Sequence, residues 1–369
     1  MTEQTIGIGL VGVQPGRSWA AIAHVPALKA LHDDFRIVGV ANTSAASAQK
    51  AVDELGIGQA FEDLDAMIAS PEVDAVSVTV KVPHHREIVA KALRAGKHVY
   101  CEWPLGNGLQ EAIELADIAR DAGVVAVAGT QARVSPALLH LRSLIGNGYV
   151  GEVLATSIVG TGGNWGPTVE PANAYTLDAA NGATMLTIPV GHLLAAVADV
   201  LGPFASVSAS LDTLRTSSRE TGSGAVVPMT APDQVLVTGH LASGAPISIH
   251  YHGGRPRGLG LTWHISGTEG DILVTGANGH AQMVELSLEG AHGQEDALRT
   301  IELPAAQEVI SNLGTLEGNV ARMYCLMAAD LRLGTRTAPS FDDAVETHRL
   351  IAAIERSARE GRVIRLPDR

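Results

Sequence analysis

The first 130 residues alternate between short, almost continuously apolar runs and longer amphipathic stretches, and this alternation strongly limits the folds open to the chain. Continuous apolar runs are typical of strands buried on both faces of a parallel sheet, and the stretches between them repeat apolar positions at helical spacing. Such a βαβ series predicts an α/β domain over residues 1–130. The predicted strands cover 6–13, 35–41, 75–82, 98–101 and 124–128, and the predicted helices cover 45–55, 64–68, 86–95 and 109–122.

The pattern changes after a predicted helix over 136–145, and residues 131–369 form a second predicted domain. Strand-like segments separated by turn residues predict an α+β domain with an open, mainly antiparallel sheet. The predicted strands cover 153–159, 205–210, 234–240, 246–252, 261–266 and 271–274, and the predicted helices cover 192–201, 316–333 and 341–361. The last two helices are candidates to pack back on the first domain. The Ser/Thr/Gly stretch 213–226 is predicted to be a surface loop.

Charge and cysteine content exclude several classes of partner and site. The chain has 26 basic and 39 acidic residues, a net charge of −13, which argues against nucleic acid or a membrane surface as partner. We find no basic leader and no window approaching the roughly 18 uninterrupted apolar residues of a membrane helix. Cys101 and Cys325 form no CxxC pair, so we expect neither a disulfide framework nor a metal site. These features predict a cytoplasmic location.

The end of the first predicted strand has the features of a dinucleotide-binding loop. A pyrophosphate binds where a glycine-containing turn leads from a strand into a helix, because backbone N–H groups and the helix dipole hold the phosphates. Gly12 and Gly16 fit this arrangement, although the loop is longer than in GxGxxG. Arg17 and Ser18 follow, and a guanidinium and a hydroxyl suit phosphate oxygens. We expect these four residues at the phosphates; a tight strand-to-helix turn is the alternative.

The second predicted strand ends in Asn42, Thr43 and Ser44, where an NAD-selective site would often have Asp or Glu against the ribose hydroxyls. Neutral side chains do not repel a 2′-phosphate, so the sequence permits NAD or NADP as cofactor. Thr43, Ser44 and Arg17 are the candidate contacts to that phosphate, and ordinary loop hydroxyls are the alternative.

Residues 95–105, AGKHVYCEWPL, closely resemble the AGKHVxCEKPL signature of the glucose-fructose oxidoreductase and inositol dehydrogenase (Gfo/Idh/MocA) family. Similar segments follow one another along nearly the whole chain: VDAVSVTV at 73–80, QAR at 131–133, GEV at 151–153 and ISGTEG at 265–270. The resemblance implies an N-terminal Rossmann domain and a C-terminal open, mainly antiparallel sheet. It also implies a hydride-transfer site between them that uses NAD or NADP on sugars, polyols or related hydroxyl compounds.

Two departures from the family pattern bear on catalysis. Trp103 stands where the family has the Lys of its EKP motif, an ammonium expected to orient substrate and assist proton transfer, which indole cannot do. In the second signature, usually GGGxLxDxGxH, Thr187 replaces the Asp and His192 comes one residue late. These changes resemble the branch that contains the fungal galactose-regulon repressor, a dinucleotide-binding regulator, together with bacterial proteins regarded as oxidoreductases. Fold alone therefore does not decide function.

Two residues are candidates to take the hydroxyl proton during hydride transfer. His192 follows a Pro-Val-Gly turn at the start of an apolar helix, whose N-terminus disfavours imidazolium and keeps the ring available as a base. A capping or packing role is its alternative. Lys81 aligns with the family's TPxxxH segment at the carboxyl end of a strand, where ligands gather. It is expected to replace the missing lysine, and an ion pair with Glu102 that only holds the site is its alternative.

The resemblance also implies cofactor contacts from Val82, Glu102, Trp103 and Pro104. Glu102 either contacts the cofactor or fixes its loop. Trp103 either stacks on the nicotinamide or substrate ring or belongs to the core. His85, at the family's His position, is expected to have a surface role.

Three further residues are candidate substrate contacts. Arg133 matches a family arginine near the domain junction. Trp165 and Tyr175 lie on or beside a Gly/Pro-rich segment, 160–174, that is long enough to cover a cleft. His250 and His252 share one strand face, where we expect an ordinary sheet surface rather than a metal pair.

These features together predict a two-domain NAD(P)-dependent oxidoreductase that acts on a small carbohydrate-like substrate. The alternative is a catalytically silent dinucleotide-binding regulator or sensor that contacts a partner protein. Because the exposed face of an open sheet needs cover, we expect a homodimer or homotetramer joined through it.

Overall fold

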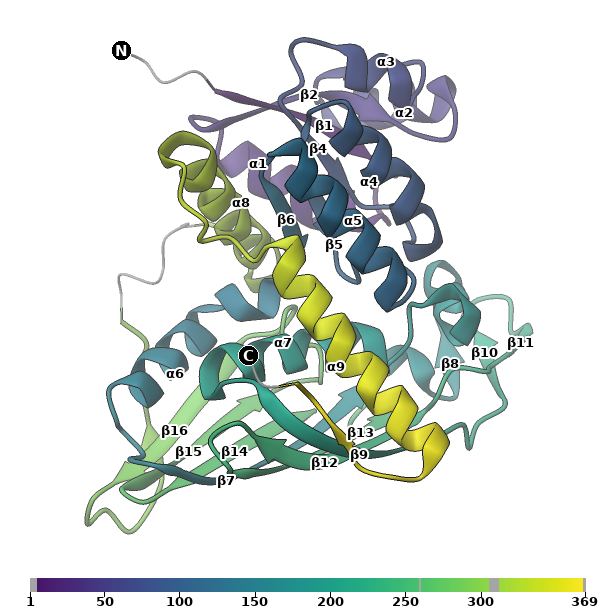
Figure 1. The fold of residues 1–369 in the computed structure, drawn as a ribbon. Helices are drawn as coiled ribbons and strands as arrows, with labels where there is room; N and C mark the ends of the chain where they lie inside the picture. The colour runs from purple at the N-terminus through teal and green to yellow at the C-terminus, as the bar shows by residue number, and fades with distance from the viewer. Residues whose placement is uncertain (1–4, 259, 305–311, 368–369) are drawn as a thin grey trace. The chain divides into compact units, whose positions relative to one another are not determined.

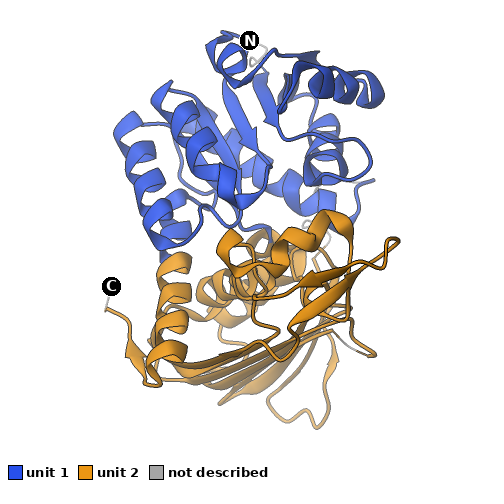
Figure 2. Cartoon of the chain, turned by 90° about the vertical axis from the view of Figure 1, so that its right-hand side faces the viewer, with its two compact units in different colours: residues 1–131, 309–346 blue, residues 132–308, 347–369 orange. Residues whose placement is uncertain are grey.

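The structure, a computed structural model, describes residues 5–258, 260–304 and 312–367. The chain divides into two compact units, coloured blue and orange in Figure 2. The first unit contains residues 1–131 and 309–346, and the second contains residues 132–308 and 347–369. The chain therefore returns to the first unit for one late helix before it re-enters the second.

The first unit is built on a six-stranded parallel sheet with the strand order β3-β2-β1-β4-β5-β6 (Figure 1). Strands β1 and β4 are buried along their whole length, as the continuous apolar runs predict. The order reverses between β1 and β4, and in such sheets ligands bind at the carboxyl ends of the strands at this switch point. The strands are Ile6–Val11 (β1), Phe35–Ala41 (β2), Gln59–Ala60 (β3), Ala75–Val78 (β4), His98–Glu102 (β5) and Ala126–Gly129 (β6).

Helices connect these strands, and three of the helices are followed by a glycine. Gly56, Gly96 and Gly123 have the left-handed φ angles of 60°, 75° and 65° that are typical of residues at helix ends. Helix α8 comes from the late part of the chain and packs on α1 and η1. The helices are Ala20–His24 (η1), Val25–Ala30 (α1), Ala45–Leu55 (α2), Leu64–Ala69 (α3), Val82–His84 (η2), His85–Arg94 (α4), Leu109–Ala122 (α5), Gln131–Val134 (η3) and Thr315–Leu333 (α8).

The second unit contains a nine-stranded sheet with the order β17-β16-β15-β14-β7-β13-β12-β9-β18. Only the central pair β13 and β7 runs parallel, so the prediction of an open, mainly antiparallel sheet is confirmed. The strands are Val153–Gly162 (β7), Phe204–Asp212 (β9), Gln234–Leu241 (β12), Pro246–Gly253 (β13), Leu261–Gly267 (β14), Gly270–Gly276 (β15), Leu286–His292 (β16), Arg299–Thr300 (β17) and Ile364–Arg365 (β18).

Helices cover one face of this sheet, and the other face is exposed among the described residues (Figure 1). On β13, Ile247, Ile249 and Tyr251 are buried while Ser248 and His250 are exposed, which is the period-two pattern of a half-buried strand. The helices are Pro136–Gly146 (α6), Gly163–Trp165 (η4), Pro171–Leu177 (η5), Ala179–Asn181 (η6), Leu186–Val190 (η7), Gly191–Leu201 (α7) and Phe341–Glu360 (α9), of which α9 begins in the first unit.

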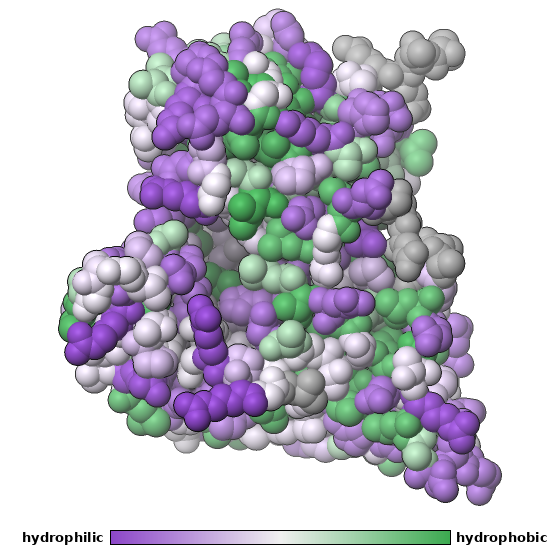
Figure 3. Space-filling model, turned by 180° about the vertical axis from the view of Figure 1, so that it is seen from behind, coloured by the Kyte–Doolittle hydropathy of each residue, from purple (hydrophilic) through white to green (hydrophobic). Residues whose placement is uncertain are grey.

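The helical stretch Ala179–Leu201 is long and apolar enough to cross a membrane by length and composition. However, 78% of its most apolar window is buried inside the protein, as is usual for a core helix. The face of the molecule in Figure 3 carries hydrophilic and apolar side chains intermingled, with no broad apolar band.

The structure corrects three predictions about strands. The predicted loop 213–226 contains β10 (Ser217–Glu220) and leads into β11 (Val226–Pro228), which form a small sheet with β8 (Thr168–Val169). The sequence of β10 lacks apolar alternation, so its pairing decides its conformation. Strand β4 ends at Val78 instead of residue 82, because the Thr79 hydroxyl donates to the carbonyl of Val11 and the chain then turns. The sequence analysis also missed β16, although its leucines alternate.

Tyr251 fixes the loop that follows β15 in the second unit. Its ring fills the space above Gly160, where an added Cβ would lie 2.1 Å from the ring. Its hydroxyl donates a 3.0 Å hydrogen bond to the carbonyl of Gly279, one residue before His280. Gly160 is therefore required for the tyrosine to reach this loop.

Replacement of Gly160 by Ala is predicted to destabilise the second unit by about 1–3 kcal/mol, because overpacking must displace the Tyr251 ring. Urea unfolding followed by tryptophan fluorescence would measure this change. Gly163→Ala is the matched control, because an added Cβ there meets no atom within 4 Å. Equal midpoints for the two variants would contradict this account of the packing.

Candidate functional site

The two glycines of the loop after β1 have different surroundings. Gly12 has φ +97°, and an added Cβ would lie 2.8 Å from a Val80 methyl carbon, so this position requires glycine. Gly16 has φ +73° and nothing within 4 Å of an added Cβ. A phosphate group can therefore approach the backbone closely at Gly16.

Hydrogen bonds within the loop hold Gln14, Arg17 and Ser18 together. The Ser18 hydroxyl accepts from the backbone N–H of Gln14 at 2.8 Å and of Ala21 at 3.3 Å, as a residue at a helix start does. Nε of Arg17 donates to the Gln14 side chain at 2.7 Å, and the arginine side chain is exposed. The structure thus gives Ser18 a capping role and leaves the rest of the Arg17 guanidinium at the surface.

The three polar residues after β2 have different surroundings. The Asn42 side chain accepts from the N–H of Val13 at 2.9 Å and donates to its carbonyl at 2.8 Å, so it ties β2 to the loop after β1. The Ser44 hydroxyl accepts from the N–H of Ser47 at 3.2 Å and caps α2. Thr43 lies between them and is exposed.

The turn after β4 carries Lys81 and Val82. Lys81 is exposed and immediately precedes η2, while Val82 is buried. His85 is also buried, with its ring nitrogens 2.9 Å from the carbonyl oxygens of Pro104 and Val80. The prediction of a surface role for His85 is therefore wrong: its ring connects the turns after β4 and β5. Burial lowers the pKa of His85, although the two carbonyl contacts oppose this effect.

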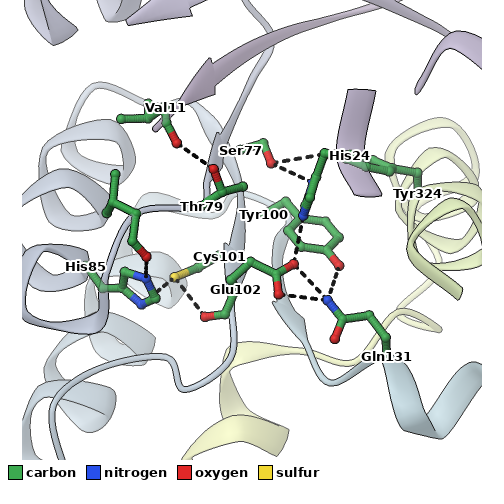
Figure 4. Close-up of polar contacts among 11 residues, drawn as sticks. Val11, His24, Ser77, Thr79, His85, Tyr100, Cys101, Glu102, Gln131 and Tyr324 are labelled. Carbon is green, nitrogen blue, oxygen red and sulfur yellow. Dashed lines mark hydrogen bonds and ion pairs between the residues drawn. The ribbon is translucent and has the colours of Figure 1, made fainter. Parts of the chain in front are cut away.

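Glu102, at the end of β5, is the centre of a buried polar network in the first unit (Figure 4). Its carboxylate accepts from Nε2 of His24 at 2.9 Å and from the Gln131 amide at 2.7 and 2.9 Å. Nδ1 of His24 lies 2.8 Å from the Tyr324 hydroxyl, which donates to the Ser77 hydroxyl at 3.0 Å. The contacts of Glu102 thus fit the loop-fixing alternative from the sequence.

Sequence reasoning missed three members of this network, which are His24, Ser77 and Tyr324. Tyr324 lies 300 residues from His24 in sequence and stacks on Tyr100 with ring centroids 4.9 Å apart. No short motif links these positions, so no local signal could have found the network. Trp103, next to Glu102, has 5% of its surface exposed, which fits the core alternative.

The first unit fits a dinucleotide at the carboxyl ends of β1, β2, β4 and β5. Gly16 leaves open space, and the indole N–H of Trp19 is buried without a hydrogen-bond partner among the described residues. An orphaned buried donor beside a glycine turn suits a phosphate oxygen. The residues present therefore match the chemistry of the predicted cofactor.

His192, the second residue of α7, is one of the buried polar residues in the core of the second unit. The residue is 3% exposed, and its Nδ1 has no hydrogen-bond partner among the described residues. Burial, and then the nearby His280, lower the pKa of His192 to about 3. The ring is therefore neutral at pH 7; the sequence had predicted a neutral ring from the helix N-terminus, whereas burial is the main cause.

His280, which is half-buried, is a second histidine near His192 that sequence reasoning missed. Burial lowers its pKa to about 4, and its Nδ1 lies 3.4 Å from the Gln282 amide nitrogen. Its ring lies nearly parallel to that of Trp165, with centroids 6.4 Å apart. Trp165 itself is fully buried and donates from its indole nitrogen to the carbonyl of Thr176 at 3.0 Å. Trp165 thus supports His280 from within the core.

The other residues of interest in the second unit have structural partners. Thr187, in the position of the family's Asp, donates to the carbonyl of Gly182 at 2.8 Å and accepts from the N–H of Thr184 at 2.7 Å. Arg133 forms a 3.0 Å ion pair with Asp199. Burial raises the pKa of the Tyr175 hydroxyl. Substrate contact by Arg133, Trp165 and Tyr175 stays a prediction.

The histidine pair on β13 and a surface groove lie elsewhere in the second unit. The rings of His250 and His252 are 6.3 Å apart, and the described residues contain no group of three metal-ligating side chains. A groove of about 930 Å³ follows the exposed face of the sheet, between residues such as Ser157, Ser248 and His264. It contains none of the predicted site residues. Association of two copies through this face also stays a prediction.

Two family descriptions match consecutive parts of the chain. Residues 6–130 match the oxidoreductase family with an NAD-binding Rossmann fold. Residues 136–276 match the C-terminal domain of Gal80p. The boundary between the two matches falls close to the division between the two units.

Relatives with both regulatory and catalytic descriptions cover the whole chain. The galactose/lactose metabolism regulatory protein GAL80 of Saccharomyces cerevisiae is 28% identical over 95% of this chain and 92% of its own. A crystal structure of its super-repressor mutant has a TM-score of 0.89 at 25% identity, covering 98% of each chain. Dehydrogenase aclE of Aspergillus oryzae is 26% identical over 97% of this chain and 98% of its own.

A solved levoglucosan dehydrogenase in complex with NADH and levoglucosan has the same fold. Its TM-score is 0.84 at 21% identity, covering 99% of this chain and all of that one. The same architecture therefore accompanies both regulation and sugar oxidation.

The lowered pKa values of His192 and His280 predict how the stability of the protein depends on pH. His192 and His280 have native pKa values of about 3 and about 4, below the value of about 6.5 for an unfolded histidine. The unfolded chain binds more protons between these values, so the free energy of unfolding falls as the pH decreases from 6.5 towards 4. Each histidine contributes up to about 1.4 kcal/mol per pH unit.

Urea unfolding across this pH range would measure the slope. His280→Gln is expected to make it shallower, and His32→Gln, which changes an exposed side chain, is the control. A slope unchanged by His280→Gln would show that His280 is not a buried neutral group.

Proposed function

The chain belongs to the Gfo/Idh/MocA oxidoreductase family, with a Gal80p-type C-terminal domain, and we propose that it is an NAD(P)-dependent oxidoreductase. Its reaction is the transfer of a hydride between nicotinamide and a hydroxyl-bearing carbon of a sugar, polyol or related compound. One observation carries this proposal: the ring nitrogen Nδ1 of His192 is buried and has no hydrogen-bond partner among the described residues. A buried polar atom without a partner costs about 1–3 kcal/mol, which a substrate hydroxyl would remove.

The first unit supplies the dinucleotide site in this proposal. Gly12 and Gly16 let the pyrophosphate approach the backbone, and Trp19 supplies a buried donor. Glu102, fixed by His24 and Gln131, holds the end of β5 in place. When bound, the nicotinamide accepts or donates the hydride at its C4 atom.

His192 interacts with the substrate hydroxyl in this proposal. As the carbinol carbon loses its hydride, the O–H bond breaks, the carbonyl forms, and the proton passes to Nδ1. Because burial keeps the ring neutral far below pH 7, its lone pair is always available to orient the hydroxyl. The same low pKa makes the ring a weak base, so it holds the proton only transiently.

Lys81 is the second residue assigned to proton transfer. It is exposed at the carboxyl end of β4, where ligands bind in parallel sheets. An ammonium there would stabilise negative charge that develops on the substrate oxygen, a role that Trp103 cannot fill.

A dinucleotide-binding regulator is the second candidate function. Two observations favour it: Trp103 lacks an ionisable group, and the Thr187 hydroxyl is engaged at the start of its own helix. Gal80 of S. cerevisiae, named as a regulatory protein, has the same architecture. In this case nucleotide binding would alter contacts with a partner protein and no product would form.

A measurement of turnover would distinguish the oxidoreductase from the regulator. NADH and NADPH binding would be followed by fluorescence, and a panel of aldoses, ketoses, inositols and sugar acids would be screened by absorbance of reduced nicotinamide. Oxidation of at least one compound is expected. Nucleotide binding without turnover across the panel would reject the enzyme and favour the regulator.

His192→Asn and Lys81→Ala are each predicted to lower kcat by about 100-fold or more, because each removes a group that handles the proton or charge. Their affinities for NAD(P)H should stay within about twofold of the parent value. Lys50→Ala, which removes an exposed lysine on α2, is the control. Full activity in either site variant would remove that residue from the mechanism.

A further inference from the structure

We propose that the site selects NADP(H) over NAD(H), and that the Arg17 guanidinium contacts the 2′-phosphate. This inference rests on the dinucleotide binding of the proposed function and is independent of turnover. It concerns the loop after β1 and the end of β2, which meet at the hydrogen bonds between Val13 and Asn42.

No carboxylate is available to bind the ribose hydroxyls from these two segments. NAD-selective sites place Asp or Glu near the end of β2, where it accepts from the 2′-hydroxyl and repels a 2′-phosphate. Residues 5–32 and 35–52 contain no Asp or Glu. The first turn of α2, which begins just after β2, has no acidic residue. A 2′-phosphate would therefore meet no negative side chain from these segments.

Asn42 cannot take the place of that carboxylate, because both ends of its amide are engaged. Its oxygen accepts from the Val13 N–H and its nitrogen donates to the Val13 carbonyl. A turn of the amide towards a ribose hydroxyl would leave these two backbone groups without their partner. Asn42 is thus a positioning residue that holds the loop against β2.

Arg17 is oriented by the same loop. Gln14, next to the clamped Val13, accepts from Nε of Arg17 at 2.7 Å through its side chain. The Gln14 carbonyl also accepts from the backbone N–H of Ser18 at 3.0 Å. The two terminal NH2 groups of the Arg17 guanidinium remain at the surface. Two nitrogens of a guanidinium can donate to two oxygens of one phosphate at the same time.

Thr43 is the second residue that we expect to contact the 2′-phosphate. It is exposed between Asn42 and Ser44, and the Ser44 hydroxyl is already used to cap α2. Thr43 therefore offers a hydroxyl donor without breaking a capping bond. It is also the position where a new carboxylate would reach the ribose without disturbing the Asn42 clamp.

Equilibrium binding to the whole protein tests the selection directly. NADPH and NADH would be titrated by fluorescence, and adenosine 2′,5′-bisphosphate and 5′-AMP would be compared by calorimetry. A charge-assisted contact to phosphate is expected to make NADPH bind about tenfold or more tightly than NADH, with the same preference in the adenosine pair. NADH affinity equal to or above that of NADPH would overturn the inference and leave the proposed function intact, whereas absence of binding by both would overturn both.

Substitutions identify the residue responsible. Arg17→Gln is expected to weaken NADPH by about tenfold and leave NADH nearly unchanged. Thr43→Glu is expected to reverse the preference, because the new carboxylate repels the 2′-phosphate and accepts from the 2′-hydroxyl. Arg94→Gln, an equal loss of charge at the exposed end of α4, is the control and should change neither affinity.

Equal weakening of both nucleotides by Arg17→Gln would place the guanidinium on the pyrophosphate, and this outcome would also overturn the inference. Thermal unfolding of each variant checks that it is folded. Because Arg17 and Thr43 are exposed, their substitution should leave the melting temperature near that of the parent protein.

Discussion

The arrangement of the first unit depends on the carboxylate of Glu102 and the groups that satisfy it. A largely buried carboxylate without partners would be strongly destabilising, and both oxygens of Glu102 accept hydrogen bonds from neighbouring side chains. His24 brings η1 to the end of β5, Gln131 brings the segment after β6, and Tyr324 brings α8 through its contact with His24. One charged group thus connects segments 300 residues apart and fixes the edge of the sheet at which ligands bind.

The second unit, like the first with its Trp19 indole, contains a buried polar group that lacks a hydrogen-bond partner among the described residues. His192 lies in an apolar helix, its Nδ1 lacks a partner among the described residues, and burial together with His280 keeps it neutral. Trp165 and Tyr251 restrain the segment that contains His280, the first by ring stacking and the second through the carbonyl of Gly279. These restraints reduce the freedom of the core to rearrange around the unsatisfied nitrogen. A buried polar atom without a partner calls for an explanation, and a role in binding or catalysis is one.

The sequence predicted the features that depend on local pattern. The parallel strands and the mainly antiparallel sheet follow from periodicity and turn residues, and the structure confirms them. It could not predict features that depend on distant contacts. Ser217–Glu220 is a strand because of its pairing with β8 and β11, and His24 is buried because of Glu102 and Tyr324. His280 was missed for the same reason, since its surroundings depend on the distant ring of Trp165.

The residues at the two family signatures differ in how well they distinguish an enzyme from a regulator. Thr187, which stands where the family has Asp, has a structural role of its own. Its hydroxyl both donates and accepts a hydrogen bond within the turn that starts its helix. Trp103 is buried beside Glu102 and packs as a core residue would. His192 has no such structural compensation, and an apolar residue of similar size would fill its position without an unsatisfied nitrogen. A site that had lost catalysis and kept only nucleotide binding would gain stability from that change, so the buried imidazole favours the enzyme.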